Sequence, residues 1–407
     1  MPGRHIIAAI AGSALIASSA VRAQEELKVG IVMPLTGTFA PVGKQIVAAA
    51  QLYMQQNGDL VAGRKIRLVV ADDRGIAENS KRLTQDLVSN QKASVIGAAI
   101  SPGALAMAPL VTDAKIATVL MVAAASTVIQ RSPYFVRTSF TLGQQSKVIA
   151  EWAAANGSRK AVIVHSDWGP GPEASAVFTE RFSNIGGQII ETIQIPLEKP
   201  DFSATMERAR AAQPDTLFLF VPAGQAHSCI ARFVEGRLRP SGVKIIGPGE
   251  ITDDDDLPSM GQSMIGVVTA GIYSAAHPSA INKAYVEATK RAGAFRRPNY
   301  ISVGGYDGMH LIYEALKKTE GKSDGDSLIA AMKGMKWESP RGPIMIDPDT
   351  RDVVQNVYLR KVERVRGELF NVEFATFEAV KDSAEHIKIT DAKMVLGNRA
   401  RPRRRGN

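Results

Sequence analysis

Two short apolar runs in the first third of the chain each lead to a serine. Residues 93–100 are followed by Ser101, and residues 116–122 lead through three alanines to Ser126. Apolar runs of this length are typical of buried parallel strands, and the residues after each serine have the pattern of a helix. The free N–H groups at a helix start, together with a serine hydroxyl, can bind an anion such as a carboxylate. Serine is also a preferred N-cap residue, so helix capping is the competing interpretation.

Two other side chains with a possible binding role also follow predicted strands. Trp168 lies in the Gly/Pro-rich loop 165–172, after a strand expected at 160–164, and Glu250 follows a strand expected at 243–246. Open α/β sheets bind ligands at the carboxyl ends of their strands. Trp168 could therefore close over a ligand or pack on its own domain. Glu250 could meet a ligand ammonium or remain exposed to solvent.

The sequence contains fragments of catalytic and metal-binding motifs, but their neighbouring elements or their spacing do not match what those motifs require. The letters G-x-S-x-G occur at residues 321–325, but they follow a predicted helix, 302–319, rather than a strand, so a polar linker is favoured. The histidines lack metal-ligand spacing. The run Asp253–Asp256 lacks the spacing of a calcium loop and is interpreted as a solvated loop. The only cysteine, Cys229, is expected to be a small buried hydrophobe. We therefore expect no catalytic residue, metal or cofactor.

The elements that would position these residues alternate between apolar strands and amphipathic helices. This order predicts right-handed βαβ units and parallel sheets covered by helices. The rhythm restarts after residue 138, which indicates two similar α/β units in series. Three helices then follow at 281–292, 302–319 and 325–332, and three strand-like segments at 343–346, 356–362 and 369–375.

The two ends of the chain carry most of its positive charge. The start has a basic residue, an apolar run from Ile6 to Ile16 and small residues up to Ala23, which is the pattern of a cleavable signal peptide. Five arginines lie between residues 399 and 405, in a tail without apolar periodicity that is expected to be disordered. Because the formal charge of +9 is concentrated at these ends, it does not indicate nucleic-acid binding.

Nearly the whole mature chain resembles one family, the leucine/isoleucine/valine-binding type of periplasmic substrate-binding proteins, which serve ABC importers. The resemblance rests on the order and spacing of segments such as KVGIVMPLTGTFAPVGKQIVAAAQLYMQQNG, VVADDRG, VIGAAIS, HSDWGPG, GPGEITDDD and GGYDGMHLIYEALKK. It implies the type I α/β fold, with two Rossmann-like lobes joined by three crossovers, a hinge and an interlobe ligand cleft. The expected division is a signal peptide at 1–23, a first lobe of 24–140 plus 276–346, a second lobe of 141–275 plus 347–390, and the basic tail at 391–407.

The resemblance also assigns roles to individual residues. By position, Ser101 and the pair Ala124 and Ser126 would hold a ligand carboxylate, Trp168 would be the aromatic lid, and Glu250 would lie near the acidic residue that takes an amino group. The loop that carries an aromatic residue in the branched-chain amino-acid binders reads Pro-Ala-Gly here, at 222–224. The ligand is therefore expected to be a branched-chain or other amino acid, or an aromatic or other organic acid.

The function expected from the sequence is solute capture without covalent chemistry. A monomeric protein in the periplasm would bind a small carboxylate by lobe closure and deliver it to an inner-membrane ABC permease. A sensory ligand-binding protein of the same fold, for amides or organic acids, is the alternative.

Overall fold

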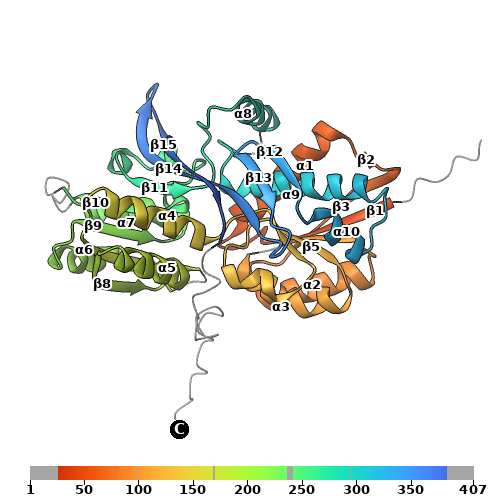
Figure 1. Ribbon diagram of the computed structural model, residues 1–407, viewed down its shortest axis with the longest axis horizontal. Coiled ribbons are helices and arrows are strands. Elements are labelled where there is room, and N and C mark those ends of the chain that lie inside the picture. The colour runs from red at the N-terminus through yellow and green to blue at the C-terminus, as the bar shows by residue number, and fades with distance from the viewer. Residues whose placement is uncertain (1–25, 99, 168–169, 236–241, 294, 383–407) are drawn as a thin grey trace, which may run out of the picture.

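The apolar runs of the sequence form two sheets, each flanked by helices, which lie side by side in the computed structural model (Figure 1). The structure describes residues 26–98, 100–167, 170–235, 242–293 and 295–382. The expected signal peptide, Trp168 and the basic tail at 391–407 lie outside the described residues.

The first sheet has six strands in the order β2-β3-β1-β4-β5-β6, and only the β2–β3 pair is antiparallel. Its middle strands are buried on both faces, as expected of a parallel sheet whose strands are continuous apolar runs. The strands are β1 (Glu26–Met33), β2 (Leu60–Val61), β3 (Arg64–Asp72), β4 (Val95–Ala98), β5 (Ala117–Leu120) and β6 (Phe135–Arg137).

Helices from two separate parts of the chain cover the first sheet. The early ones are α1 (Ala40–Asn57), α2 (Ala77–Ser89), α3 (Ser101–Asp113) and the 3₁₀ turn η1 (Ser126–Arg131), and the later ones are α8 (Ala280–Ala292), α9 (Tyr300–Lys318) and α10 (Gly325–Met332). Helix α1 packs along α9, and α2 packs along α3. Helix α9 therefore packs with a helix of the first lobe, and the division of the chain into lobes stays a prediction.

The second sheet has nine strands, in the order β12-β13-β14-β11-β10-β9-β7-β8 with β15 paired to β14. Strands β7 to β11 pair in parallel, whereas every pair that involves β12 to β15 is antiparallel. The strands are β7 (Lys160–Ser166), β8 (Gln188–Ile195), β9 (Thr216–Phe220), β10 (Lys244–Pro248), β11 (Val268–Gly271), β12 (Lys336–Ser339), β13 (Gly342–Ile346), β14 (Val353–Val365) and β15 (Glu368–Val380).

The helical elements described in the second lobe are four long helices and three 3₁₀ turns. They are α4 (Leu142–Ala155), α5 (Gly171–Asn184), α6 (Phe202–Ala211), α7 (Ala223–Glu235), η3 (Gly249–Thr252), η4 (Leu257–Ser259) and η5 (Gln262–Met264). Helix α4 begins with a capping box, in which the Thr141 hydroxyl accepts from the Gln144 N–H and the Gln144 side chain accepts from the Thr141 N–H. This cap fixes the helix start directly after the chain has left the first sheet.

The chain passes between the lobes three times: after β6, after β11 and before β12. The last passage is shared by both lobes, because β12 and β13 hydrogen-bond toward β14 while Ile346 and Trp337 pack in the hydrophobic core of the first lobe. The sequence placed residues up to 346 in the first lobe, and this boundary stays a prediction.

Two further features of the fold concern the single cysteine and the apolarity of the helices. Cys229 is fully buried in a cluster of the second lobe, as expected, and burial raises the pKa of its thiol to about 12. Among the described helices, none is long and apolar enough to cross a membrane.

Candidate functional site

A cavity between the two lobes contains three of the residues that the sequence singled out, Ser101, Ala124 and Glu250. Its empty space, including the part open to solvent, is about 470 Å³. The remaining lining residues are Phe39, Val42, Ile100, Val122, Phe140, Leu142, Pro170, Phe220, Tyr300 and Ile301.

Four aromatic side chains make the cavity a site for a flat apolar body. Phe39 precedes α1, Phe140 lies on the first crossover, Phe220 ends β9, and Tyr300 is the first residue of α9. The rings of Phe140 and Tyr300 meet edge to face, with centroids 5.3 Å apart and an interplanar angle of 84°. Such a geometry is favourable for aromatic pairs and holds both rings in place.

Ser101 provides a hydrogen-bond donor at the first-lobe side of the cavity. It is the first residue of α3 and is 5% exposed. Its Oγ accepts hydrogen bonds from the backbone N–H groups of Ala124 and Ala125, each at 3.2 Å. Two N–H donors occupy the oxygen, so the hydroxyl proton is free to point to an anion. The amino-terminal end of α3 adds a favourable field for negative charge.

A buried arginine holds the loop that faces Ser101. The guanidinium of Arg137 donates to the carbonyl oxygens of Ala123 and Ala125 and forms an ion pair with Asp352, in which Nε and Oδ1 are 2.9 Å apart. The Ala123 carbonyl shares its peptide unit with the Ala124 N–H, so Arg137 fixes the orientation of one of the two donors to Ser101. The Ala125 carbonyl shares its peptide unit with the Ser126 N–H, which Arg137 orients in the same way. The loop is therefore ordered before any ligand arrives.

Glu250 provides the carboxyl group on the second-lobe side. It lies in η3, directly after β10, and is 6% exposed, so the alternative that it is exposed to solvent is wrong. Its Oε1 accepts from the Gln145 side chain at 3.2 Å, whereas Oε2 has no hydrogen-bond partner among the described residues. Burial raises the pKa of Glu250 to about 7, and the charge of nearby Arg360 only partly opposes this. One carboxyl oxygen is thus available to a ligand.

Ser126 does not line this cavity; it binds a side chain of the other lobe instead. Its N–H lies 3.1 and 3.2 Å from the two carboxylate oxygens of Glu173, and its hydroxyl donates to Oε1 at 2.6 Å. Burial raises the pKa of Glu173 to about 7, although these hydrogen bonds favour its ionised form. A ligand-binding role of Ser126 stays a prediction.

The expected lid cannot be placed, because Trp168 lies outside the described residues. Pro170, two positions later, is buried and lines the cavity. The part of the loop that is described therefore reaches the site, and the role of Trp168 stays a prediction.

The sequence missed all four aromatic residues. Phe39 and Phe220 stand where strand segments meet loops, a signal that could have been used, and Phe220 directly precedes the loop at 222–224 that lacks an aromatic residue. Phe140 lies on the first passage between the lobes and Tyr300 begins α9, and only the tertiary arrangement brings them together.

The acidic run Asp253–Asp256 is only partly the solvated loop that the sequence indicated, because Asp253 and Asp254 are buried whereas Asp256 is exposed. Asp253 is 3% exposed, and both of its carboxylate oxygens accept from the Asn299 side chain, at 3.1 and 2.8 Å. Asp255 accepts from the Gln45 side chain of α1 at 2.9 Å. Burial raises the pKa of Asp253 to about 8. Polar partners from the first-lobe helices α1 and α9 explain why this run can leave water.

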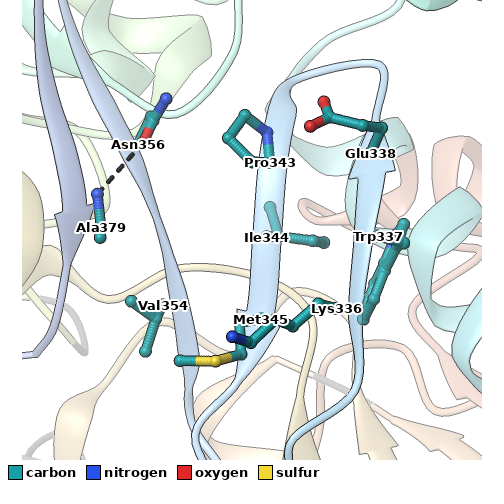
Figure 2. A pocket seen from close by; sticks show the side chains of 9 residues that line it. All are labelled: Lys336, Trp337, Glu338, Pro343, Ile344, Met345, Val354, Asn356 and Ala379. Atoms are coloured by element: carbon teal, nitrogen blue, oxygen red, sulfur yellow. Dashed lines mark hydrogen bonds between the residues drawn. The ribbon is translucent and has the colours of Figure 1, made fainter.

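A second, wider hollow lies on the strands that join the lobes (Figure 2). Its lining residues are Lys336, Trp337, Glu338, Pro343, Ile344, Met345, Val354, Asn356 and Ala379. It shares no residue with the interlobe cavity and contains none that the sequence had selected. Within the described ranges, no group of three His, Cys, Asp or Glu side chains could hold a metal ion. Ser323 lies in the connection between α9 and α10 and so does not follow a strand along the chain.

Known proteins resemble the chain over most of its length. A family described as "Periplasmic binding protein" matches residues 26–367. The Leu/Ile/Val-binding protein homolog 6 of Brucella abortus (strain 2308) is 37% identical over 381 residues, which are 92% of this chain and 97% of that protein.

Two solved structures are similar in both fold and sequence. The solute-binding protein of an ABC transporter from Rhodopseudomonas palustris BisB5, in complex with 3,4-dihydroxybenzoic acid, is 56% identical with a TM-score of 0.85, covering 88% of this chain and 99% of that one. The corresponding protein from R. palustris HaA2, in complex with p-hydroxybenzoic acid, is 36% identical with a TM-score of 0.85, covering 89% and 100%.

Proposed function

This chain belongs to the periplasmic binding protein family of ABC transporters, and we propose that it captures a hydroxylated benzoate in the interlobe cavity and delivers it to an ABC permease. The observation that carries the proposal is the composition of the cavity. Among the described lining residues, four carry aromatic rings and three carry polar side chains, Ser101, Glu250 and Tyr300. A benzoate has one carboxylate, one flat ring and few other polar groups, and so it matches this lining.

The two ends of the ligand would be recognised by different lobes. The carboxylate would accept from the Ser101 hydroxyl and lie near the amino-terminal end of α3. A ring hydroxyl would pair with Oε2 of Glu250, the buried oxygen without a partner. Because each lobe holds one end, binding would favour the closed arrangement of the lobes.

Glu250 would separate hydroxybenzoates from benzoate. A ligand without a ring hydroxyl leaves Oε2 buried and unpaired, which costs about 1–3 kcal/mol, or roughly a 5- to 150-fold loss in affinity. An amino acid would present an ammonium group, which needs about three acceptors. Among the described lining residues Glu250 is the only anionic side chain, so the ammonium group of a leucine-like ligand would be less well satisfied.

A thermal-shift screen tests the ligand class. We expect 3,4-dihydroxybenzoate and 4-hydroxybenzoate to raise the Tm, since a ligand at about 100 times its Kd stabilises a protein by about 2.7 kcal/mol. Benzoate should give a smaller shift and leucine none. A shift with leucine or valine but with no benzoate would contradict the proposal and would favour Glu250 as an ammonium partner.

A further inference from the structure

Glu173 and Ser126 form a buried contact that is separate from the interlobe cavity lining. The serine donates to the carboxylate through both its N–H and its hydroxyl, with N···O distances of 3.1 and 3.2 Å and an O···O distance of 2.6 Å. Ser126 is 3% exposed and Glu173 is 6% exposed. Hydrogen bonds of this kind, between a carboxylate and donors sheltered from water, are among the stronger ones in proteins.

The two partners come from different lobes. Ser126 begins η1, between β5 and β6 of the first sheet, and Glu173 lies in the first turn of α5, directly after β7 of the second sheet. Helix α5 packs on α4 and β7, so Glu173 moves with the second lobe. A hinge opening that separates the lobes would break this contact and return both groups to water.

In each lobe, the residue that forms the contact is close along the chain to residues of the ligand cavity. Ser126 directly follows Ala124 and Ala125, whose N–H groups hold the Ser101 hydroxyl. Glu173 lies three residues after Pro170, which lines the cavity. Breaking the contact would therefore release the cavity wall at Pro170 from the loop that positions Ser101.

The surroundings of Glu173 make the contact selective for the closed form. Arg137 is near enough to favour the carboxylate electrostatically, but it is already engaged with Asp352 and with backbone carbonyls. Asp382 acts in the opposite direction. Among the described residues, the buried Glu173 carboxylate thus accepts its hydrogen bonds from the N–H and hydroxyl of Ser126.

We propose that Glu173 and Ser126 form an interlobe latch that slows ligand release by holding the lobes closed. Glu173 is a positioning residue in this scheme, since it touches the opposite lobe and not the ligand. The inference rests on the proposed function only in that closure is what retains the ligand.

Release kinetics provide the first test. In stopped-flow experiments with 3,4-dihydroxybenzoate, Glu173→Ala and Ser126→Ala should each raise koff about tenfold or more, with little change in kon. Ser126→Ala removes the hydroxyl donor but keeps the backbone N–H, so the double variant should resemble Glu173→Ala, which removes the whole contact. Glu180→Ala is the matched control, since Glu180 is an exposed carboxylate on the same helix and should leave koff unchanged.

Small-angle X-ray scattering of the ligand-free variants provides a second test that does not depend on the ligand. Loss of the latch should increase the radius of gyration, whereas Glu180→Ala should leave it as in the wild type. Glu173→Gln keeps an acceptor for the serine hydroxyl, and it should have an intermediate effect even if Glu173→Ala folds poorly.

Three results would overturn the latch. These are unchanged koff and radius of gyration in all latch variants, additive effects in the double variant, and tighter binding by Glu173→Ala, which would mean that Glu173 competes with the ligand carboxylate. If wild-type protein fails to bind 3,4-dihydroxybenzoate, the proposed function fails, and the scattering comparison still decides for or against the latch.

Discussion

The buried carboxyl group of Glu250 makes ligand affinity depend on pH. Burial raises its pKa to about 7 in the absence of ligand. A bound benzoate brings a second negative charge into the same cavity, and two like charges in a poorly solvated space disfavour each other. The complex therefore favours protonated Glu250, which can donate to a ring hydroxyl oxygen. Binding near neutral pH should take up a proton.

The size of the effect follows from the position of the pKa. The pKa of Glu250 is about 7 in the free protein and should be higher in the complex. Ligand affinity is therefore highest well below pH 7, where Glu250 is protonated, and falls as the pH rises through 7. If only the protonated form binds, Kd should be about tenfold larger at pH 8 than at pH 6, a difference of about 1.4 kcal/mol. The Glu250→Gln variant cannot titrate and should give a flat profile.

Titration calorimetry with 4-hydroxybenzoate measures this directly. Kd is determined from pH 6 to pH 8, and the apparent enthalpy at pH 7 is compared in phosphate and Tris buffers, which differ in ionisation enthalpy. Glu180→Gln serves as a control with the same change at an exposed site. A wild-type Kd that does not vary with pH, or a profile that persists in Glu250→Gln, would refute the reasoning.

Three further predictions concern the anion site, the packing and the stability. Ser101→Ala should raise the Kd for 4-hydroxybenzoate about tenfold or more while the fold is retained, and equal affinity by calorimetry would remove Ser101 from the site. Gly43→Ala should lower the free energy of unfolding in urea by about 1–3 kcal/mol, because its Cβ would lie 2.0 Å from the Pro34 carbonyl oxygen; Gly224→Ala, with open space around it, is the control and should not destabilise. The Tm of the ligand-free protein should fall between pH 5 and pH 8, because burial raises the pKa of Asp253 to about 8 and that of Glu173 to about 7, so the stability present at low pH is lost as these groups ionise; a Tm that rises over this range would contradict their burial.

Local patterns were sufficient to predict most of the fold. Apolar runs correspond to buried strands such as β4 and β5, and their serine or glycine ends correspond to helix starts. For the same reason Ser101, Ala124 and Glu250 could be proposed together: each follows a strand, and the strand ends meet at the edge that faces the cleft. The short strands β2 and β12 were missed because two- and four-residue segments give little periodic signal.

Contacts between distant segments could not be predicted. Asp253 looks like part of a solvated acidic run until the fold brings Asn299 to it. Nothing in the sequence pairs Ser126 with Glu173 of the other lobe, although the fold brings the two into contact. The aromatic lining has the same origin, since Phe140 and Tyr300 meet only because the chain passes repeatedly between the lobes. In each case the sequence shows what kind of contact the side chain can make, but it does not show which distant residue the fold brings to it.

A crystal structure of the protein grown with 3,4-dihydroxybenzoate is the most direct test of the central claim. The account predicts the ligand carboxylate within hydrogen-bond distance of the Ser101 hydroxyl, the ring among Phe140, Phe220 and Tyr300, and a ring hydroxyl on Oε2 of Glu250. A ligand with its carboxylate turned to the second lobe, or one bound outside the interlobe cavity, would contradict it.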